Sequence, residues 1–303
     1  MGSLSFRWTS TFSPFFIVRF DRSMKSFDSP DLEAVALFRS HVGLGGPRTD
    51  LDSLRLILRH YARIPYENIS KIIQVARHPD LEGKFRMPSQ VMQDHIAHRL
   101  GGTCFSLSYL LEQILLASGF SCYKAMAHMH AGENIHCVMV VKVSGKRYLA
   151  DPGYLLWEPL PLSRERSQVA CTPRGKVELV YDPAGALFHL FTLEVQDRKW
   201  RYRFSDQPVS DEEFREHWIA SFSRPTMHKI LLNQLTEKGQ LYIRGNHLRL
   251  TSLSEEKKAN IRQDYHRQIQ DLFGIESGWV EEALSILRQQ RMEWGRGKGQ
   301  GLG

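Results

Sequence analysis

The spacing of apolar residues changes twice along this chain, and these changes constrain its fold more than any other feature. From Asp31 to Ile73, and again from Phe105 to Leu115, apolar residues recur at intervals of three and four, which predicts amphipathic helices. In "NIHCVMVVKV" at 134–143 the period is two and β-branched residues are common, which predicts a strand. After residue 210 helical and strand patterns alternate. The chain therefore reads as a helical region, a β-rich region and a mixed region.

Individual elements follow from the same patterns and from their flanking turn residues. Helices are predicted at 32–38, 51–61, 89–97, 210–221, 254–273 and 276–293. A hairpin is predicted from strand 134–143, a turn at 144–146 and strand 147–151. Further strands are predicted at 176–181, 187–195, 199–204, 228–235, 240–245 and 247–252.

These elements give an α+β fold with three regions: a helical domain at 24–118, a β domain at 119–209 and an α/β unit at 210–293. The tail at 294–303 has no apolar residue before Leu302, so we expect it to be disordered. At the other end Met24 is an alternative start, which would leave residues 1–23 as a disordered or misassigned extension. The chain contains no internal repeat.

Composition excludes several classes of protein. Hydrophobic residues make up 42% of the chain and charged residues 24%, with no apolar run long enough to span a bilayer, so no membrane partner is expected. The net charge of +7 attracts anions, and a phosphorylated small molecule fits it. Lys and Arg are scattered without a basic block, so we expect no nucleic-acid partner. The oligomeric state is left open.

The four cysteines, at 104, 122, 137 and 171, form no CxxC pair, and no secretory signal precedes them because the apolar run "FFIV" at 15–18 is too short. This favours free thiols and a cytoplasmic location.

Cys104 lies in the first turn of the predicted helix in "GGTCFSLSYLLEQILL". The positive end of the helix dipole and its unpaired N–H groups stabilise a thiolate there. A cysteine on an apolar helix is also a common buried filler, so position alone leaves both interpretations open.

A neighbouring base and acid would distinguish a catalytic cysteine from a buried structural one. His136 lies in the strand "NIHCVMVV", and Asp151 ends the next strand of the hairpin. Adjacent strands bring such residues side by side, where a carboxylate can orient an imidazole that accepts a thiol proton. A strand histidine and a turn aspartate are each ordinary alone, but the Cys–His–Asp order favours nucleophilic catalysis. Cys122, Cys137 and Cys171 are taken as structural.

At these residues the sequence resembles the arylamine N-acetyltransferase family. Its nucleophile motif, Arg-Gly-Gly-x-Cys, is matched by Arg99, Gly101, Gly102 and Cys104, with Leu100 inserted after the arginine and Ser106 where a glutamate is common. The family's histidine strand matches "NIHCVMVV", and its aspartate before a Gly-aromatic pair matches Asp151 with "GY" at 153–154. "IPYENIS" and, more weakly, 222–250 extend the similarity.

The resemblance implies a helical bundle, a β-barrel and an α/β lid, with the triad at the junction of helices and barrel. It implies ping-pong transfer of an acetyl group from acetyl-CoA, through an acetyl-cysteine at Cys104, to an arylamine, arylhydrazine or related amine. It also implies coenzyme A beside Gly132 and no metal. We expect Phe105 and Tyr154 to contact the substrate.

Two other functions remain open. The same triad would serve an amide synthase or thiol hydrolase that uses a larger acyl group. A non-catalytic or metal-binding protein is the second, based on Cys122, His128, His130, His136 and Cys137, although only His128 and His130 have a spacing that approaches a zinc motif.

Overall fold

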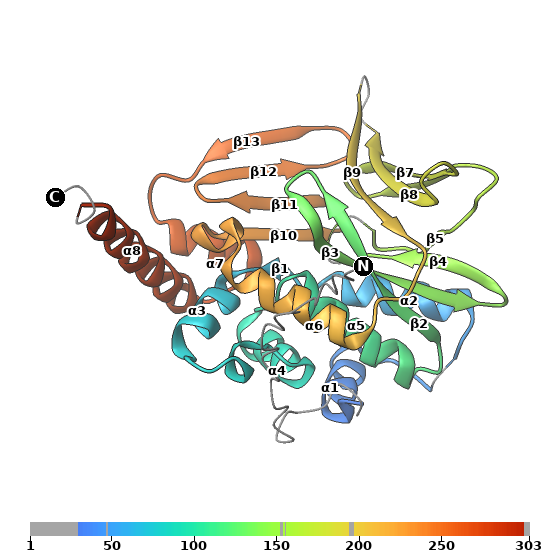
Figure 1. Ribbon diagram of the computed structural model, residues 1–303, viewed down its shortest axis with the longest axis horizontal. Helices are drawn as coiled ribbons and strands as arrows, with labels where there is room; N and C mark the ends of the chain where they lie inside the picture. Colours follow the sequence, from blue (N-terminus) through green and yellow to red (C-terminus); the bar gives the residue numbers. More distant parts are fainter. Residues whose placement is uncertain (1–29, 47, 152–153, 155, 194–196, 300–303) are drawn as a thin grey trace, which may run out of the picture.

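The computed structural model describes residues 30–46, 48–151, 154, 156–193 and 197–299, so the predicted extension at 1–23 lies outside the described residues. Helices come first, an eight-stranded sheet follows, and a five-stranded sheet with three helices comes last (Figure 1). This order is the predicted α+β succession. In the part of the chain that the structure describes, no helix is both long and apolar enough to cross a bilayer.

The first region contains five helices and a short 3₁₀ turn at Glu82–Lys84. Asp31 and Asp50 cap the first two helices by accepting hydrogen bonds from the amides of Ala34 and Ser53. The third helix, which the sequence patterns did not separate from its neighbours, follows the break at Pro65. The helices are α1 Leu32–Val42, α2 Leu51–Tyr61, α3 Ile69–Arg77, α4 Pro88–His98 and α5 Cys104–Ala117.

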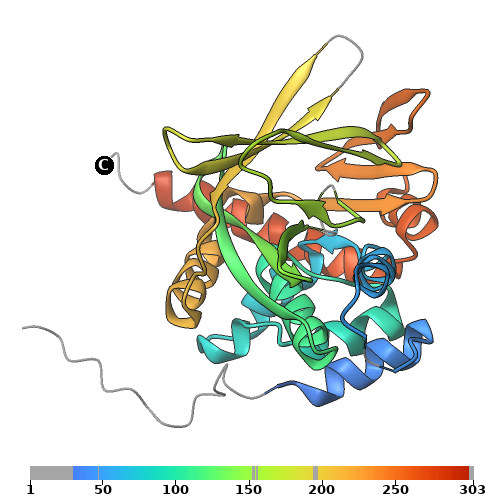
Figure 2. The same cartoon turned by 90° about the vertical axis from the view of Figure 1, so that its right-hand side faces the viewer.

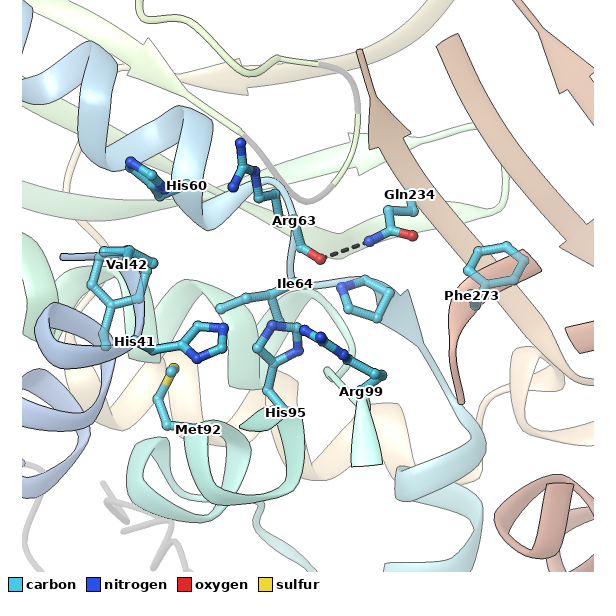
Figure 3. A pocket seen from close by; sticks show the side chains of 12 residues that line it. His41, Val42, His60, Arg63, Ile64, Met92, His95, Arg99, Gln234 and Phe273 are labelled. Carbon is cyan, nitrogen blue, oxygen red and sulfur yellow. Dashed lines mark hydrogen bonds between the residues drawn. The ribbon is translucent and has the colours of Figure 1, made fainter. Parts of the chain in front are cut away.

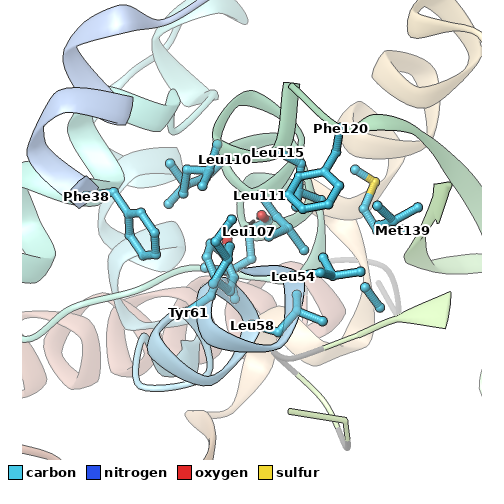
Figure 4. Packing of buried hydrophobic residues seen from close by; sticks show 14 of the residues in the cluster. Phe38, Leu54, Leu58, Tyr61, Leu107, Leu110, Leu111, Leu115, Phe120 and Met139 are labelled. Atoms are coloured by element: carbon cyan, nitrogen blue, oxygen red, sulfur yellow. Dashed lines mark hydrogen bonds between the residues drawn. The ribbon is translucent and has the colours of Figure 1, made fainter. Parts of the chain in front are cut away.

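Apolar side chains of α1, α2, α4 and α5 form one core together with the start of the barrel-like sheet (Figure 4). Leu110 and Leu54 are fully buried there, and the Tyr61 hydroxyl donates to the carbonyl of Leu107. Met139, from a strand of the sheet, is part of this core. Helix α5 therefore packs between the other helices and the sheet. Burial of this apolar surface fixes the position of α5.

The second region is an antiparallel sheet in the order β5-β4-β3-β2-β9-β8-β7-β6. Its edge strands β5 and β6 contact each other, which nearly closes the sheet into a barrel. Figure 2 shows the long green strands curving from the helices toward the yellow strands. The strands are β2 Ser121–Met129, β3 Gly132–Val143, β4 Lys146–Ala150, β5 Leu160–Pro161, β6 Gln168–Thr172, β7 Gly175–Asp182, β8 Leu187–Leu193 and β9 Arg198–Ser205.

The third region forms the antiparallel sheet β1-β10-β11-β12-β13. Its edge strand β1, Tyr66–Glu67, comes from the first region and pairs with β10. Helices α3, α7 and α8 pack against this sheet in a second core (Figure 1). The remaining elements are α6 Asp211–Ala220, β10 Leu231–Thr236, β11 Gly239–Arg244, β12 His247–Thr251, β13 Glu256–Asn260, α7 Tyr265–Phe273 and α8 Ser277–Gly299.

Two predicted elements in this region differ from the structure. The helix expected at 254–273 is strand β13 followed by α7, because "EKKAN" pairs with β12 and this tertiary pairing overrides the helical preference of Glu, Lys and Ala. The tail expected to be disordered from 294 is helical as far as Gly299, because α8 continues through a segment without proline. Residues 300–303 lie outside the described part.

Candidate active site

Cys104 is the first residue of α5 and follows the N-cap Thr103. Its thiol is half-buried, and Sγ lies 3.6 Å from the carbonyl oxygen of Ile135, to which it donates. The unpaired amides and the positive end of the helix dipole at this position favour a negative sulfur. The predicted helix start is therefore confirmed.

Two close backbone contacts hold the segment before the cysteine. Tyr66 forms a parallel bridge with Gly102, and the amide of Glu67 donates to the Gly102 carbonyl at 2.9 Å. A Cβ on Gly101 would lie 1.9 Å from the carbonyl oxygen of Pro65, so only glycine fits there. The buried Arg86 donates to the carbonyl of Gly101 at 3.0 Å. The "PYEN" segment thus positions the start of the helix that carries Cys104.

His136 and Asp151 lie on neighbouring parts of the sheet. His136 is in β3, Asp151 directly follows β4, and His136 Nε2 lies 2.8 Å from Asp151 Oδ2. Both side chains are buried. With Nε2–H donated to the carboxylate, Nδ1 is the ring nitrogen left to accept a proton. The predicted hairpin therefore brings the predicted base and acid into contact.

The charge on His136 is strongly stabilised. Burial disfavours the imidazolium, but Asp151, by attraction and by hydrogen bonding, together with the Cys104 sulfur outweighs that cost and raises the pKa of His136 to about 10. One small cavity of about 20 Å³ is lined by Cys104, His136 and Asp151, together with Tyr66. The three predicted residues are thus brought to one cavity.

Two cations near Cys104 were not predicted. Lys71 Nζ is buried and donates to the carbonyl and the hydroxyl of Ser221 at 2.9 and 2.6 Å, and burial lowers the pKa of Lys71 to about 7. Arg224 donates to the carbonyl of Asn134 at 3.2 Å. Cys104 attracts both cations electrostatically. No local pattern marks them, because Lys71 lies on a helix among isoleucines and Arg224 is 120 residues from the cysteine in sequence (224 − 104).

The predicted binding residues have different surroundings. The Tyr154 ring lies 5.4 Å from the His136 ring, and the backbone carbonyl of Tyr154 accepts a hydrogen bond from the Asn233 side-chain amide. Phe105 is buried against Phe214 at 5.5 Å, away from the small cavity. Gly132 begins β3 opposite Met129 with φ +151°, and its neighbourhood holds no feature that identifies a ligand. Gly153 of the predicted Gly-aromatic pair lies outside the described residues.

The other thiols differ from Cys104. Burial raises the pKa of Cys122 to about 12 and that of Cys137 still further, while Cys171 is exposed. Within the described ranges, no three His, Cys, Asp or Glu side chains gather in a way that could hold a metal ion.

Known proteins resemble this chain in sequence and in fold. The sequence model of the N-acetyltransferase family matches residues 50–280, which is most of the chain. The chain belongs to the arylamine N-acetyltransferase family. It is 28% identical over 240 residues to arylamine N-acetyltransferase 1 of Oryctolagus cuniculus, covering 69% of this chain and 79% of that protein. The resemblance predicted from the sequence is confirmed, and so is the enzyme class, an acyltransferase.

Solved arylamine N-acetyltransferases share the fold. The Salmonella typhimurium enzyme aligns with TM-score 0.69 and 18% identity over 86% of this chain and 99% of that one. The Mycobacterium abscessus enzyme aligns with TM-score 0.71 and 18% identity over 83% and 94%. A Bacillus cereus arylamine N-acetyltransferase with TM-score 0.62 is described with a Cys-His-Glu catalytic triad; it is 18% identical over 80% of this chain and 98% of that one. These likenesses confirm the fold class of this arylamine N-acetyltransferase family member.

Proposed function

We propose that the protein transfers an acetyl group from acetyl-CoA to an arylamine, arylhydrazine or related amine through an acetyl-cysteine on Cys104. The observation that carries this proposal is the single cavity lined by Cys104, His136 and Asp151, with the imidazole 2.8 Å from the carboxylate. The family to which the chain belongs and the names of its relatives support the donor and the class of acceptor.

In the first half-reaction the Cys104 thiolate attacks the thioester carbonyl of acetyl-CoA. The carbon–sulfur bond to coenzyme A breaks, a bond from the acetyl carbon to Sγ forms, and the His136 imidazolium gives its Nδ1 proton to the departing thiolate. Asp151 keeps its charge throughout and holds the ring by the 2.8 Å contact with Nε2. The helix start and the nearby cations Lys71 and Arg224 favour the anionic sulfur.

In the second half-reaction the amine attacks the acetyl carbonyl. His136, now neutral, accepts the proton that the amine loses, and the Cys104 thiolate leaves. The amide departs and the thiolate–imidazolium pair returns.

Coenzyme A would reach Cys104 as a substrate. We propose that its pantetheine arm passes near Gly132 at the start of β3, and that the net charge of +7 attracts its phosphates from a distance. Tyr154, whose ring packs against His136, would contact the substrate on the imidazole side. Phe105 would act indirectly, by packing on Phe214 behind Cys104.

The direct test is intact-mass measurement after mixing with acetyl-CoA. We expect one acetyl group on the protein, lost when an arylamine is added, and no acetyl group on Cys104→Ala. Cys122→Ala is the matched control, since it also removes one half-buried thiol but should acetylate normally. An acetyl group that persists on Cys104→Ala would overturn the assignment.

An amide synthase or thiol hydrolase with a larger acyl group remains the alternative. A panel of acyl-CoA donors, each offered to water and to an aromatic amine, separates them. The proposal requires acetyl-CoA to react faster than longer donors and the amine to accept the group in preference to water.

A further inference from the structure

A second cavity, of about 350 Å³, lies where α1, α2 and α4 meet β10 and α7 (Figure 3). It shares no lining residue with the cavity around Cys104. Both cavities nevertheless contact the same short segment, because Ile64 and Pro65 line the larger one and Tyr66 lines the smaller. Its volume falls within the range of pockets that hold small organic molecules.

Five of its lining residues carry or can acquire positive charge: His41, His60, Arg63, His95 and Arg99. No Asp or Glu lines the cavity in the described part of the chain. Arg63 lies at the mouth of the cavity, where its guanidinium is 3.8 Å from the Glu237 carboxylate and both side chains are mostly exposed. Such an exposed contact is weak, so the charge of the cavity is largely uncompensated.

His95 and Arg99 are held in place. Arg99 is the C-cap of α4, with φ +58°, and its amide donates to the His95 carbonyl at 3.0 Å. Its side chain lies close to Gly274, where an added Cβ would be 3.1 Å from Arg99 Cγ. His95 is buried, and its Nδ1 lies 2.9 Å from the Leu100 carbonyl. Arg99 lines the cavity and is exposed to solvent, so its guanidinium is available at the cavity mouth. A fixed cation at the mouth of a cavity suits an anionic ligand.

The surroundings of His95 disfavour its charged form. Burial is the main cause that lowers the pKa of His95 to about 4; the positive charges of His41 and Arg99 act in the same direction, and the hydrogen bond with the Leu100 carbonyl opposes them. The His41 ring packs edge-on against the His95 ring at 5.6 Å. A negative group in the cavity would reverse the repulsion among these side chains.

Apart from Gln234, the other side chains that line the cavity are apolar. Phe38, Val42, Ile64, Met92 and Phe273 line it beside the cationic groups (Figure 3). A hydrated inorganic anion would leave these side chains without a contact, whereas an aromatic or aliphatic body would bury them.

We propose that this cavity binds a small organic anion, in which a carboxylate or phosphate group contacts the arginines and histidines and a compact apolar body packs on Phe38, Met92 and Phe273. Guanidinium groups recognise both kinds of oxyanion, so the shared chemistry is a terminal oxyanion on an apolar body. The site is independent of the acetyl transfer proposed at Cys104.

The test is calorimetric binding of 2-naphthoate and phenyl phosphate to the full chain, with 2-naphthalenemethanol and inorganic phosphate as matched probes. We expect one site for one or both organic anions, at least tenfold tighter than for the neutral alcohol or for phosphate alone. The stronger of the two organic anions identifies the oxyanion class. Equal binding of the alcohol, or of inorganic phosphate, would overturn the proposal.

Two variants locate the site. Arg99→Asn removes the charge and retains a residue that tolerates the left-handed cap, and it should weaken binding about tenfold or more. Val42→Phe fills the cavity without removing a charge, and it should also weaken binding. Arg55→Asn, an exposed arginine on α2 paired with Asp52, is the control and should bind as the parent does. Parent-like binding by both Arg99→Asn and Val42→Phe, with parent-like melting, would refute the location.

Discussion

The two cavities of this protein differ in size and in chemistry. The cavity of about 350 Å³ contains three histidines and two arginines but no nucleophile, whereas that of about 20 Å³ contains Cys104, His136 and Asp151. In the large cavity burial, with the positive neighbours adding to it, lowers the pKa of His95 to about 4; in the small one the Asp151 carboxylate outweighs burial and raises the pKa of His136 to about 10. Two buried histidines thus differ because only one of them has a carboxylate beside it, and the volume of a cavity does not show where chemistry occurs.

The largest predicted effect removes the neighbour that makes this difference. Asp151→Asn keeps the size of the side chain but not its charge, so the His136 imidazolium loses its stabilisation and the ring its orientation. We expect kcat/KM for acetyl transfer to fall by about 10³ to 10⁴. Steady-state rates with acetyl-CoA and an arylamine measure this fall.

A matched control lies in the barrel-like sheet. Asp182 is 4.0 Å from His189 Nε2 and more exposed, so Asp182→Asn should change kcat/KM less than twofold. If Asp151→Asn retained more than a tenth of the parent activity, the carboxylate would not be part of the mechanism.

Thiol alkylation provides the second prediction, which compares the cysteines in one protein. Because the pKa of His136 is raised to about 10, its imidazolium persists across neutral pH, and the sulfur of Cys104 should react readily with iodoacetamide. Cys171 is exposed and serves as the reference thiol. At pH 6 we expect Cys104 to react about a hundredfold faster than Cys171, measured by peptide mass spectrometry.

Cys122 and Cys137 serve as internal controls for burial. The pKa of Cys122 is raised to about 12 and that of Cys137 further, so both should resist alkylation in the folded protein. A Cys104 rate no higher than that of Cys171 would contradict the thiolate–imidazolium pair.

The sequence predicted which side chains meet at the small cavity because short segments specify their positions. A cysteine at a helix start, and a hairpin that joins His136 to Asp151, involve contacts that periodicity and turn residues determine locally. The family resemblance and the fold class were likewise confirmed. The roles of the triad residues stay predictions that the experiments above would test.

The large cavity was not predictable, because its charged and titratable side chains come from the ends of three helices that meet only in the folded chain. Lys71 was missed for the same reason, since its partner Ser221 is 150 residues away in sequence. The inserted Leu100, which departs from the family motif, is fully buried in the second core. Strand β13 shows the reverse, a local helical preference that pairing with β12 overrides.

The third prediction concerns the backbone contact beside both cavities. In Gly101→Ala the new Cβ would meet the carbonyl oxygen of Pro65 at 1.9 Å, and the backbone must move because neither segment has a flexible atom to yield. We expect a loss of about 1 to 3 kcal/mol in the free energy of unfolding, measured by urea denaturation. The contact between the Pro65 segment and the nucleophile loop should loosen with it.

Gly102→Ala is the control for this prediction. Its Cβ would meet Ser106 Oγ at 2.3 Å, and that hydroxyl can rotate away at the cost of its bond to the Thr103 carbonyl. The loss should be the smaller of the two. A Gly101→Ala protein as stable as the parent would show that the close approach is not required.

The smallest predicted effect concerns Lys71, the buried cation near the small cavity. Its pKa is about 7 in the folded chain and near 10.5 when unfolded, so the unfolded chain binds more protons between these values and Lys71 makes stability rise with pH through that window. Below pH 7 the folded chain carries the full cost of a buried ammonium group. Between pH 6.5 and 8.0 this contribution should amount to about 1 kcal/mol.

Lys71→Met removes this dependence and keeps the length of the side chain. The difference in unfolding free energy between parent and variant should therefore shift by about 1 kcal/mol in favour of the parent from pH 6.5 to 8.0. His136 also titrates differently in the two states, but it is present in both proteins and cancels from the difference. Lys146→Met, at an exposed turn of the hairpin, should show no such shift. A pH-independent difference for Lys71→Met would mean that the buried amine keeps its proton throughout, and Lys71 would then act on Cys104 as a permanent positive charge.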